Sequence, residues 1–169
     1  MPEVDFDPSR LIAVLARHSV RFIVIGAVAA IAQGSPLPTE DLDITPARDP
    51  ENLERLAAAL QELGAKLRFS RAEGVDFPSD AEFLGRMDAW TLTTEAGDLD
   101  IAFVPPGTQG YHDLVGDASE VDLGAPVLVA SLRDVIRSKE AANRPKDIAQ
   151  LPALRQTLEV IRERERRGV

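Results

Sequence analysis

Apolar residues recur at helical spacing in two segments, and each segment follows an Asp-Pro pair, at residues 7–8 and 49–50. Aspartate favours the N-cap of a helix and proline its first turn, while Gly64 is a suitable C-terminal stop for the second segment. The pattern therefore predicts helices over residues 8–18 and 50–63. Their apolar stripes are Leu11, Val14 and Leu15 in the first and Leu53, Leu56, Leu60 and Leu63 in the second.

Short runs of β-branched and aromatic residues predict the strands of a sheet. These runs cover residues 21–25, 41–45, 89–95 and 99–104, with a further strand or hairpin at 121–129. The Gly-Asp pair in Ala96-Gly97-Asp98 favours a turn that joins the third and fourth runs. The first run leads into Gly26 and a short Ala-rich helix that ends before Gly34. Residues 66–88 carry too weak a pattern for an assignment.

The C-terminal part of the chain has a helical pattern. Ser131 is a suitable N-cap for a helix that extends to Ala142, and the residues that follow continue as helix, with an interruption expected at Pro152. We therefore expect an α/β (α+β) protein with a mixed sheet, flanking helices and a helical C-terminal part. Residues 1–130 would form the core, and residues 131–169 would pack on it within a single compact unit.

Composition excludes several classes of function. The 169 residues include no cysteine and two histidines, so neither a thiol nucleophile nor a zinc site with Cys and His ligands is expected. The net charge of −9 opposes general binding to nucleic acid, which depends on neutralising phosphates with Lys and Arg. The apolar run 22–32 is shorter than the roughly 20 residues of a membrane span. It also follows no basic leader, so we expect a cytoplasmic protein without a membrane partner.

Acids alternate with hydrophobic residues in two nearly identical stretches, EDLDI from residue 40 and GDLDI from residue 97. On a strand, Asp41 and Asp43 would project from one face while the residues next to them enter the core. Two close carboxylates repel each other, and a divalent cation with oxygen ligands, such as Mg²⁺, relieves that repulsion. The first stretch is therefore a candidate metal site.

A neighbouring strand would provide a third carboxylate. Asp100 has the same setting between hydrophobic residues as the first pair, whereas Asp98 follows Gly97 at the expected hairpin tip, where exposed acids need no further explanation. The acids Asp41, Asp43 and Asp100 would then hold Mg²⁺ or Mn²⁺. Two ordinary solvated strand faces explain the same pattern, and these residues alone leave both interpretations open.

The order of these features resembles the nucleotidyltransferase superfamily that includes DNA polymerase β. A strand ending at Gly26-Ala27 precedes a small-residue helix, a Pro-containing loop, Thr39-x-Asp41-x-Asp43 and the later acid Asp100. More closely, residues 22–154 are similar to small bacterial nucleotidyltransferases related to the MenT and AbiEii toxins. The resemblance implies the mixed-sheet fold of that superfamily and a metal-dependent transfer of a nucleotidyl group.

A basic segment extends the resemblance beyond the acids. The sequence from residue 138 to residue 147 is similar to a Lys…Arg-x-[Lys/Arg]-Asp motif of that group. The resemblance implies that Lys139, with Arg144 or Lys146, neutralises the triphosphate of an NTP, and that Asp147 orients one of these cations.

The resemblance also implies roles for the other residues of the motif. Asp41 and Asp43 would hold Mg²⁺ (or Mn²⁺) on the triphosphate, and Asp100 with a second ion would activate the acceptor hydroxyl. Gly26-Ala27 would bring the start of a helix close to the phosphates. Thr39 would belong to the same nucleotide site.

Three functions remain open. The first is transfer of an NMP from an NTP to a hydroxyl of RNA, such as a tRNA end, by a toxin with a cognate antitoxin protein. The second is transfer to a protein or to a small molecule such as an antibiotic. The third is a non-catalytic, degenerate fold that acts as a binding or antitoxin-like partner. Two departures from the group favour the third: Ala27 replaces a second Gly or a Ser, and Leu37 replaces a common Arg.

Overall fold

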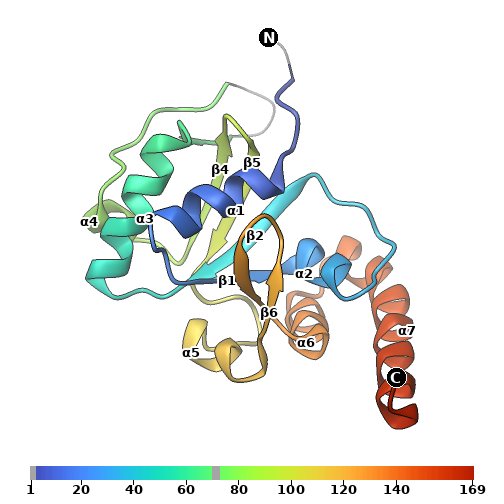
Figure 1. The fold of residues 1–169 in the computed structure, drawn as a ribbon. Helices are drawn as coiled ribbons and strands as arrows, with labels where there is room; N and C mark the ends of the chain where they lie inside the picture. Colours follow the sequence, from blue (N-terminus) through green and yellow to red (C-terminus); the bar gives the residue numbers. More distant parts are fainter. Residues whose placement is uncertain (1–2, 70–72) are drawn as a thin grey trace.

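A mixed sheet forms the centre of the computed structural model, which describes residues 3–69 and 73–169 (Figure 1). Within these residues the sheet has seven strands in the order β3-β4-β5-β2-β1-β7-β6. The strands are β1 (Phe22–Ile25), β2 (Asp41–Pro46), β3 (Lys66–Leu67), β4 (Ala89–Thr94), β5 (Gly97–Ala102), β6 (Ser119–Asp122) and β7 (Pro126–Val129). Strand β2 is antiparallel to β1 and parallel to β5, so the expectation of a mixed sheet is confirmed.

Helices flank the sheet, and the expected caps hold their starts. Asp7 accepts a hydrogen bond from the Arg10 N–H, and Asp49 accepts one from the Asn52 N–H. Ser131 accepts one from Asp134 in the same way. The helices are α1 (Pro8–Arg17), α2 (Gly26–Ala32), α3 (Pro50–Glu62), α4 (Ala81–Leu84), α5 (Tyr111–Leu114), the 3-10 turn η1 (Val115–Asp117), α6 (Leu132–Ala142) and α7 (Pro145–Arg167).

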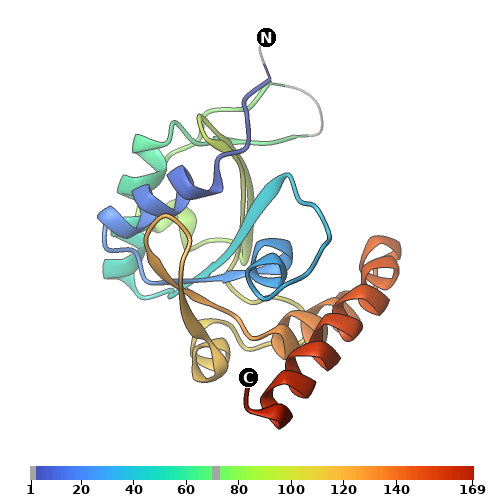
Figure 2. The same cartoon turned by 45° about the vertical axis from the view of Figure 1, so that its right-hand side comes forward.

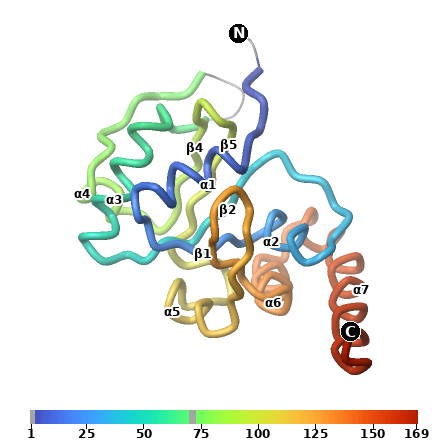
Figure 3. Tube along the Cα trace, viewed as in Figure 1, coloured from blue at the N-terminus to red at the C-terminus, as the bar shows by residue number. Residues whose placement is uncertain are grey.

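The helices lie in two groups on opposite sides of the sheet. Helices α1 and α3 pack against each other and cover one side, and α1 also contacts β2 and β5 (Figures 1 and 2). Helix α6 packs against α2 and α7. The two C-terminal helices, α6 and α7, lie on the opposite side of the molecule from α3 (Figure 3). The apolar core lies mainly between the sheet and the first group of helices.

The two DLDI stretches are hydrogen-bonded neighbours in the sheet. Strands β2 and β5 run parallel in a register that pairs Asp41 with Asp98 and Asp43 with Asp100. The leucines between them, Leu42 and Leu99, are also paired, and both are fully buried. Because side chains alternate along a strand, burial of the leucines on one face turns all four acids toward the other.

The turn between β4 and β5 differs from the expectation. Asp98 is the second residue of β5 and not a turn residue, because the strand begins at Gly97. The hydroxyl of Thr94 accepts the Ala96 N–H and donates to the Gly97 carbonyl, which closes a turn over the two residues Glu95 and Ala96. Gly97 has a φ of +106°, which a residue with a side chain rarely adopts.

The expected interruption at Pro152 is wrong. Helix α7 continues through this proline from Pro145 to Arg167. Proline removes one hydrogen-bond donor from the helix. The adjacent Leu151 and nearby Leu154 are buried, and their packing holds the segment helical across the lost bond. Among the described residues, no helix is long and apolar enough to cross a membrane.

Truncation of Leu99 should destabilise the protein strongly. We expect Leu99→Ala to lower the free energy of unfolding by about 2–5 kcal/mol, because the change leaves a cavity under the acid-bearing strands. Val160 on α7 is 44% exposed, so Val160→Ala is the matched control and should change stability by about 0.5 kcal/mol or less. Urea unfolding of both variants measures the difference. Equal stability of the two variants would contradict the central position of this leucine.

Candidate active site

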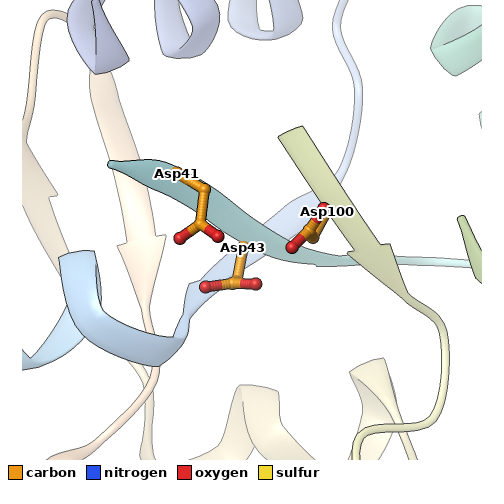
Figure 4. Close-up of side chains that lie close together, drawn as sticks. All are labelled: Asp41, Asp43 and Asp100. Atoms are coloured by element: carbon orange, nitrogen blue, oxygen red, sulfur yellow. The ribbon is translucent and has the colours of Figure 1, made fainter. Parts of the chain in front are cut away.

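Three of the acids form a compact cluster on the face of the sheet opposite α1 and α3. Asp41, Asp43 and Asp100 each offer one carboxylate oxygen, and these oxygens lie within 4.8 Å of one another. Figure 4 shows the first two side chains on β2 and the third on β5, with their carboxylates directed to the same side of the strands. Carboxylate oxygens are the ligands that Mg²⁺ and Mn²⁺ prefer, so the donor set fits such an ion.

Thr39 holds the first of these acids. Its hydroxyl lies 3.1 Å from Oδ1 of Asp41 and 3.1 Å from the carbonyl oxygen of the same residue. The loop that leads into β2 therefore restrains the orientation of this carboxylate before any ligand binds.

The backbone at the start of α2 comes unusually close to the second acid. A Cβ atom at Gly26 would lie 2.5 Å from Oδ2 of Asp43, and the residue has a φ of +64°. Both facts favour glycine at this position, because a side chain would displace the Asp43 carboxylate and strain the backbone. The neighbouring Ala27 also borders the cleft in front of the acids, so the expected juxtaposition of the Gly-Ala pair and the acids is present.

Basic residues of the C-terminal part of the chain form a second wall of that cleft, here called the basic wall. Lys139 on α6 lies with Nζ 3.5 Å from Oδ1 of Asp147, and Arg144 Nε donates to Oδ2 of the same carboxylate at 2.7 Å. Asp147 has no exposed side-chain surface. Burial acts to raise its pKa, but the hydrogen bond from Arg144 and the nearby charges hold that pKa below its ordinary value. Lys146 lines the same wall from the first turn of α7.

The cleft has a volume of about 440 Å³ and brings the predicted residues together. Leu37 is absent from its lining among the described residues, and this side chain packs partly buried against the core. The residues from sequence reasoning that border it are Gly26, Ala27, Thr39, Asp41, Asp43, Asp100, Lys139, Arg144, Lys146 and Asp147.

Crowding of the carboxylates changes their acidity. Burial raises the pKa of Asp43 to about 7, and the charges of Asp41 and Asp100 act in the same direction. The cations Lys139 and Lys146 oppose this rise but do not cancel it. Burial likewise raises the pKa of Asp100 to about 6. The nearby cations therefore leave both pKa values raised, and a divalent cation would supply further positive charge at the cluster.

Sequence reasoning missed two residues next to the cleft. Arg68 pairs with Asp98 at 2.8 Å and with Asp100 at 2.9 Å. It follows the two-residue strand β3, in a segment whose pattern is too weak to place it beside the acids. Asp134 is buried in the first turn of α6 and lines the cleft. Acids are common in the first turn of a helix, so the sequence did not mark this residue as part of a site.

Comparisons with solved structures identify the architecture. The lincosamide antibiotic adenylyltransferase LnuA, bound to lincomycin, aligns with a TM-score of 0.61 and 12% identity, over 92% of this chain and 99% of that one. The chain has the nucleotidyltransferase fold. No protein-family model and no curated protein matches the sequence significantly.

Two further structures share this fold. ANT(2'')-Ia in complex with adenylyl-2''-tobramycin aligns with a TM-score of 0.54 and 18% identity, over 94% of each chain. A putative nucleotidyltransferase from Thermotoga maritima aligns with a TM-score of 0.50 and 19% identity, over 91% of this chain and 95% of that one. These matches show the fold alone, and the sequence resemblance to the nucleotidyltransferase superfamily and to the toxin group stays a prediction.

Without divalent cations, stability should fall as the pH rises toward neutrality. The folded state raises the pKa of Asp43 to about 7. Its stabilising contribution is therefore present below the unfolded value of about 4 and is lost as the pH rises through 7. We expect Asp43→Asn in EDTA to melt above the wild type at pH 8, by about 2–4 °C for each kcal/mol of repulsion that is removed.

The same pair of proteins should melt within about 1 °C of each other at pH 3, below the unfolded value of about 4, where the wild-type carboxyl is largely protonated in both the folded and the unfolded state. The exposed Asp117 provides a control, because Asp117→Asn should leave the pH dependence of the wild type unchanged. Differential scanning calorimetry at the two pH values measures all three proteins. A variant of Asp43 that melts below the wild type at pH 8 would contradict the inferred crowding.

Proposed function

We propose that the protein transfers a nucleoside monophosphate from an NTP to an acceptor hydroxyl, with Mg²⁺ or Mn²⁺ as the metal. The observation that carries this proposal is the cleft between an acid cluster and a basic wall. Asp41, Asp43 and Asp100 line it from the sheet, and Lys139 and Arg144 line it from the C-terminal part of the chain. An NTP with its bound cation needs both kinds of partner, because it carries phosphate charge and a metal ion together.

Each part of the cleft has a role in the proposed reaction. Lys139, Arg144 and Lys146 would bind phosphate oxygens, and Gly26 permits close approach of the chain to Asp43. A divalent ion, when bound by the acids, would stabilise the charge on the phosphates and lower the pKa of the incoming hydroxyl.

The proposed chemistry is an in-line displacement at the α-phosphorus. The acceptor oxygen forms a new bond to this phosphorus, and the bond to the oxygen that bridges the α- and β-phosphates breaks. Pyrophosphate leaves, and Asp100 takes the proton of the acceptor hydroxyl. Its pKa of about 6 leaves it largely ionised at neutral pH and therefore able to accept that proton.

A small molecule is the acceptor that the observations favour. Two solved structures with the same fold contain the antibiotic lincomycin and an adenylylated tobramycin. The chain carries a net charge of −9, which opposes binding of a polyanion. The C-terminal arginines of α7 are partly neutralised within the helix, since Arg162 pairs with Glu159 and Arg167 with Glu163. An RNA acceptor, and a toxin role with an antitoxin partner, stay predictions of the sequence resemblance.

Transfer of label from an NTP tests the proposal. We expect the wild-type protein with Mg²⁺ and α-labelled NTPs to label at least one acceptor from a set of aminoglycosides, lincosamides and total RNA. Asp41→Ala should reduce this labelling to background because it removes a ligand from the metal site. Asp117→Asn, a change of an exposed acid outside the cleft, should retain the wild-type level.

The pattern of labelling separates the open functions. Label in RNA alone would replace the small-molecule acceptor with the RNA acceptor. Thermal melting tests nucleotide binding without any acceptor, since a ligand at a hundredfold excess over its Kd stabilises a protein by about 2.7 kcal/mol. No labelling, together with no thermal shift by ATP and Mg²⁺, would contradict the proposal and favour the non-catalytic function that Ala27 and Leu37 suggest.

The two acids of β5 should differ in importance. Asp100→Asn should lower the rate of transfer by about 100-fold or more, because it removes the proposed proton acceptor and metal ligand. Asp98→Asn should retain the rate within about tenfold, because this carboxylate pairs with Arg68 and does not belong to the cluster of three acids. Initial rates with the labelled acceptor measure both. The reverse order would show that the wrong carboxylate has been assigned.

A further inference from the structure

The guanidinium of Arg68 spans the two acids of β5. Its Nη1 lies 2.8 Å from Oδ2 of Asp98, and its Nη2 donates to Oδ1 of Asp100 at 2.9 Å. Arginine presents its donors in a rigid planar fork, so contacts from two nitrogens fix orientation as well as charge. One oxygen of the third cluster acid is therefore bonded to an arginine that the proposed reaction does not itself use.

The strand beside it holds the arginine in place. The backbone N–H of Arg68 donates to the Thr91 carbonyl, and its Nη1 also donates to the Leu92 carbonyl at 3.0 Å. Its side chain is 22% exposed. Both ends of the residue are thus attached to β4, and the guanidinium has little freedom to follow a moving carboxylate.

This arrangement separates the roles of two otherwise equivalent acids. The register places Asp98 beside Asp41 and Asp100 beside Asp43, so all four carboxylates leave the same face of the sheet. With Oδ1 of Asp100 bonded to the guanidinium, its other oxygen is available to the cluster, and Figure 4 shows one oxygen of this residue directed toward Asp43.

We propose that Arg68 is a positioning residue that holds Asp100 in the orientation in which it binds the divalent ion, and that it keeps Asp98 out of the metal site. This role rests on the proposed function, since it concerns the same metal cluster. Arg68 does not itself line the cleft, and it reaches the cleft only through the Asp100 carboxylate and the Thr91 backbone, so it acts through this carboxylate and not on the substrate.

The loss of the Arg68 charge and the loss of its orienting bonds would change the affinity for Mn²⁺ in opposite directions. Removal of a cation next to four carboxylates makes the site more negative, which on Coulomb attraction alone tightens the binding of Mn²⁺. Loss of an orienting partner weakens metal binding, typically 10- to 100-fold. The direction of the change in Mn²⁺ affinity therefore distinguishes a positioning residue from a simple counter-charge.

Titration of the metal-free protein with Mn²⁺ alone, followed by electron paramagnetic resonance, tests this role without any turnover. We expect Arg68→Ala to weaken Mn²⁺ binding about tenfold or more. Arg48→Ala is the matched control, because Arg48 also joins an acid, Asp88, to two backbone carbonyls, those of Gly85 and Met87. The control should lose stability without weakening Mn²⁺ binding.

A conservative variant keeps the test decisive if the alanine variant does not fold. Arg68→Lys retains the charge but cannot bond two carboxylates through a planar fork. Weaker Mn²⁺ binding by the lysine variant supports the positioning role, and wild-type binding by it overturns that role.

The outcomes also distinguish a failure of the role of Arg68 from a failure of the proposed function. No Mn²⁺ binding by the wild-type protein would overturn the proposed metal site, and the role of Arg68 with it. Wild-type binding that Asp43→Asn abolishes, combined with equal or tighter binding by Arg68→Ala, would overturn the role of Arg68 alone.

Discussion

The parallel pairing of β2 with β5 is the constraint on which the candidate site depends. Leu42 and Leu99 are buried against the same layer of helices, and their burial fixes which face of each strand meets the core. A slip of one residue would bring acids into the core and leucines into water, so the register is strongly specified. Hydrophobic packing on one face thereby sets the spacing of carboxylates on the other.

This arrangement is electrostatically costly without a ligand. Burial and mutual repulsion raise the pKa values of Asp43 and Asp100 to about 7 and about 6. The available cations relieve this cost only in part: Lys139 is bonded to Asp147, and Arg68 binds one oxygen of Asp100. The electrostatic cost therefore falls where a divalent cation would relieve it, which is the physical basis for proposing a metal site on this face.

Regular elements and the acids were predictable because their signals are local. Capping residues such as Asp49 and periodic leucines define helices within a few residues of sequence, and alternation alone puts Asp41 and Asp43 on one face. The strand start at Gly97 and the uninterrupted helix at Pro152 were not predictable in this way. A side-chain bond from Thr94 closes the turn, and tertiary packing holds the helix through its missing hydrogen bond.

The sequence by itself determined the inventory of the site: its alternating acids, its Gly-Ala pair and the basic segment around Lys139. Only the tertiary structure decided which partners these acids meet. Asp100 belongs to the cluster of three acids, and Arg68 pairs with both Asp98 and Asp100 although it lies about thirty residues away on a segment without a recognisable pattern. A contact between such distant residues depends on the order of strands β3, β4 and β5 in the sheet, which no local periodicity encodes.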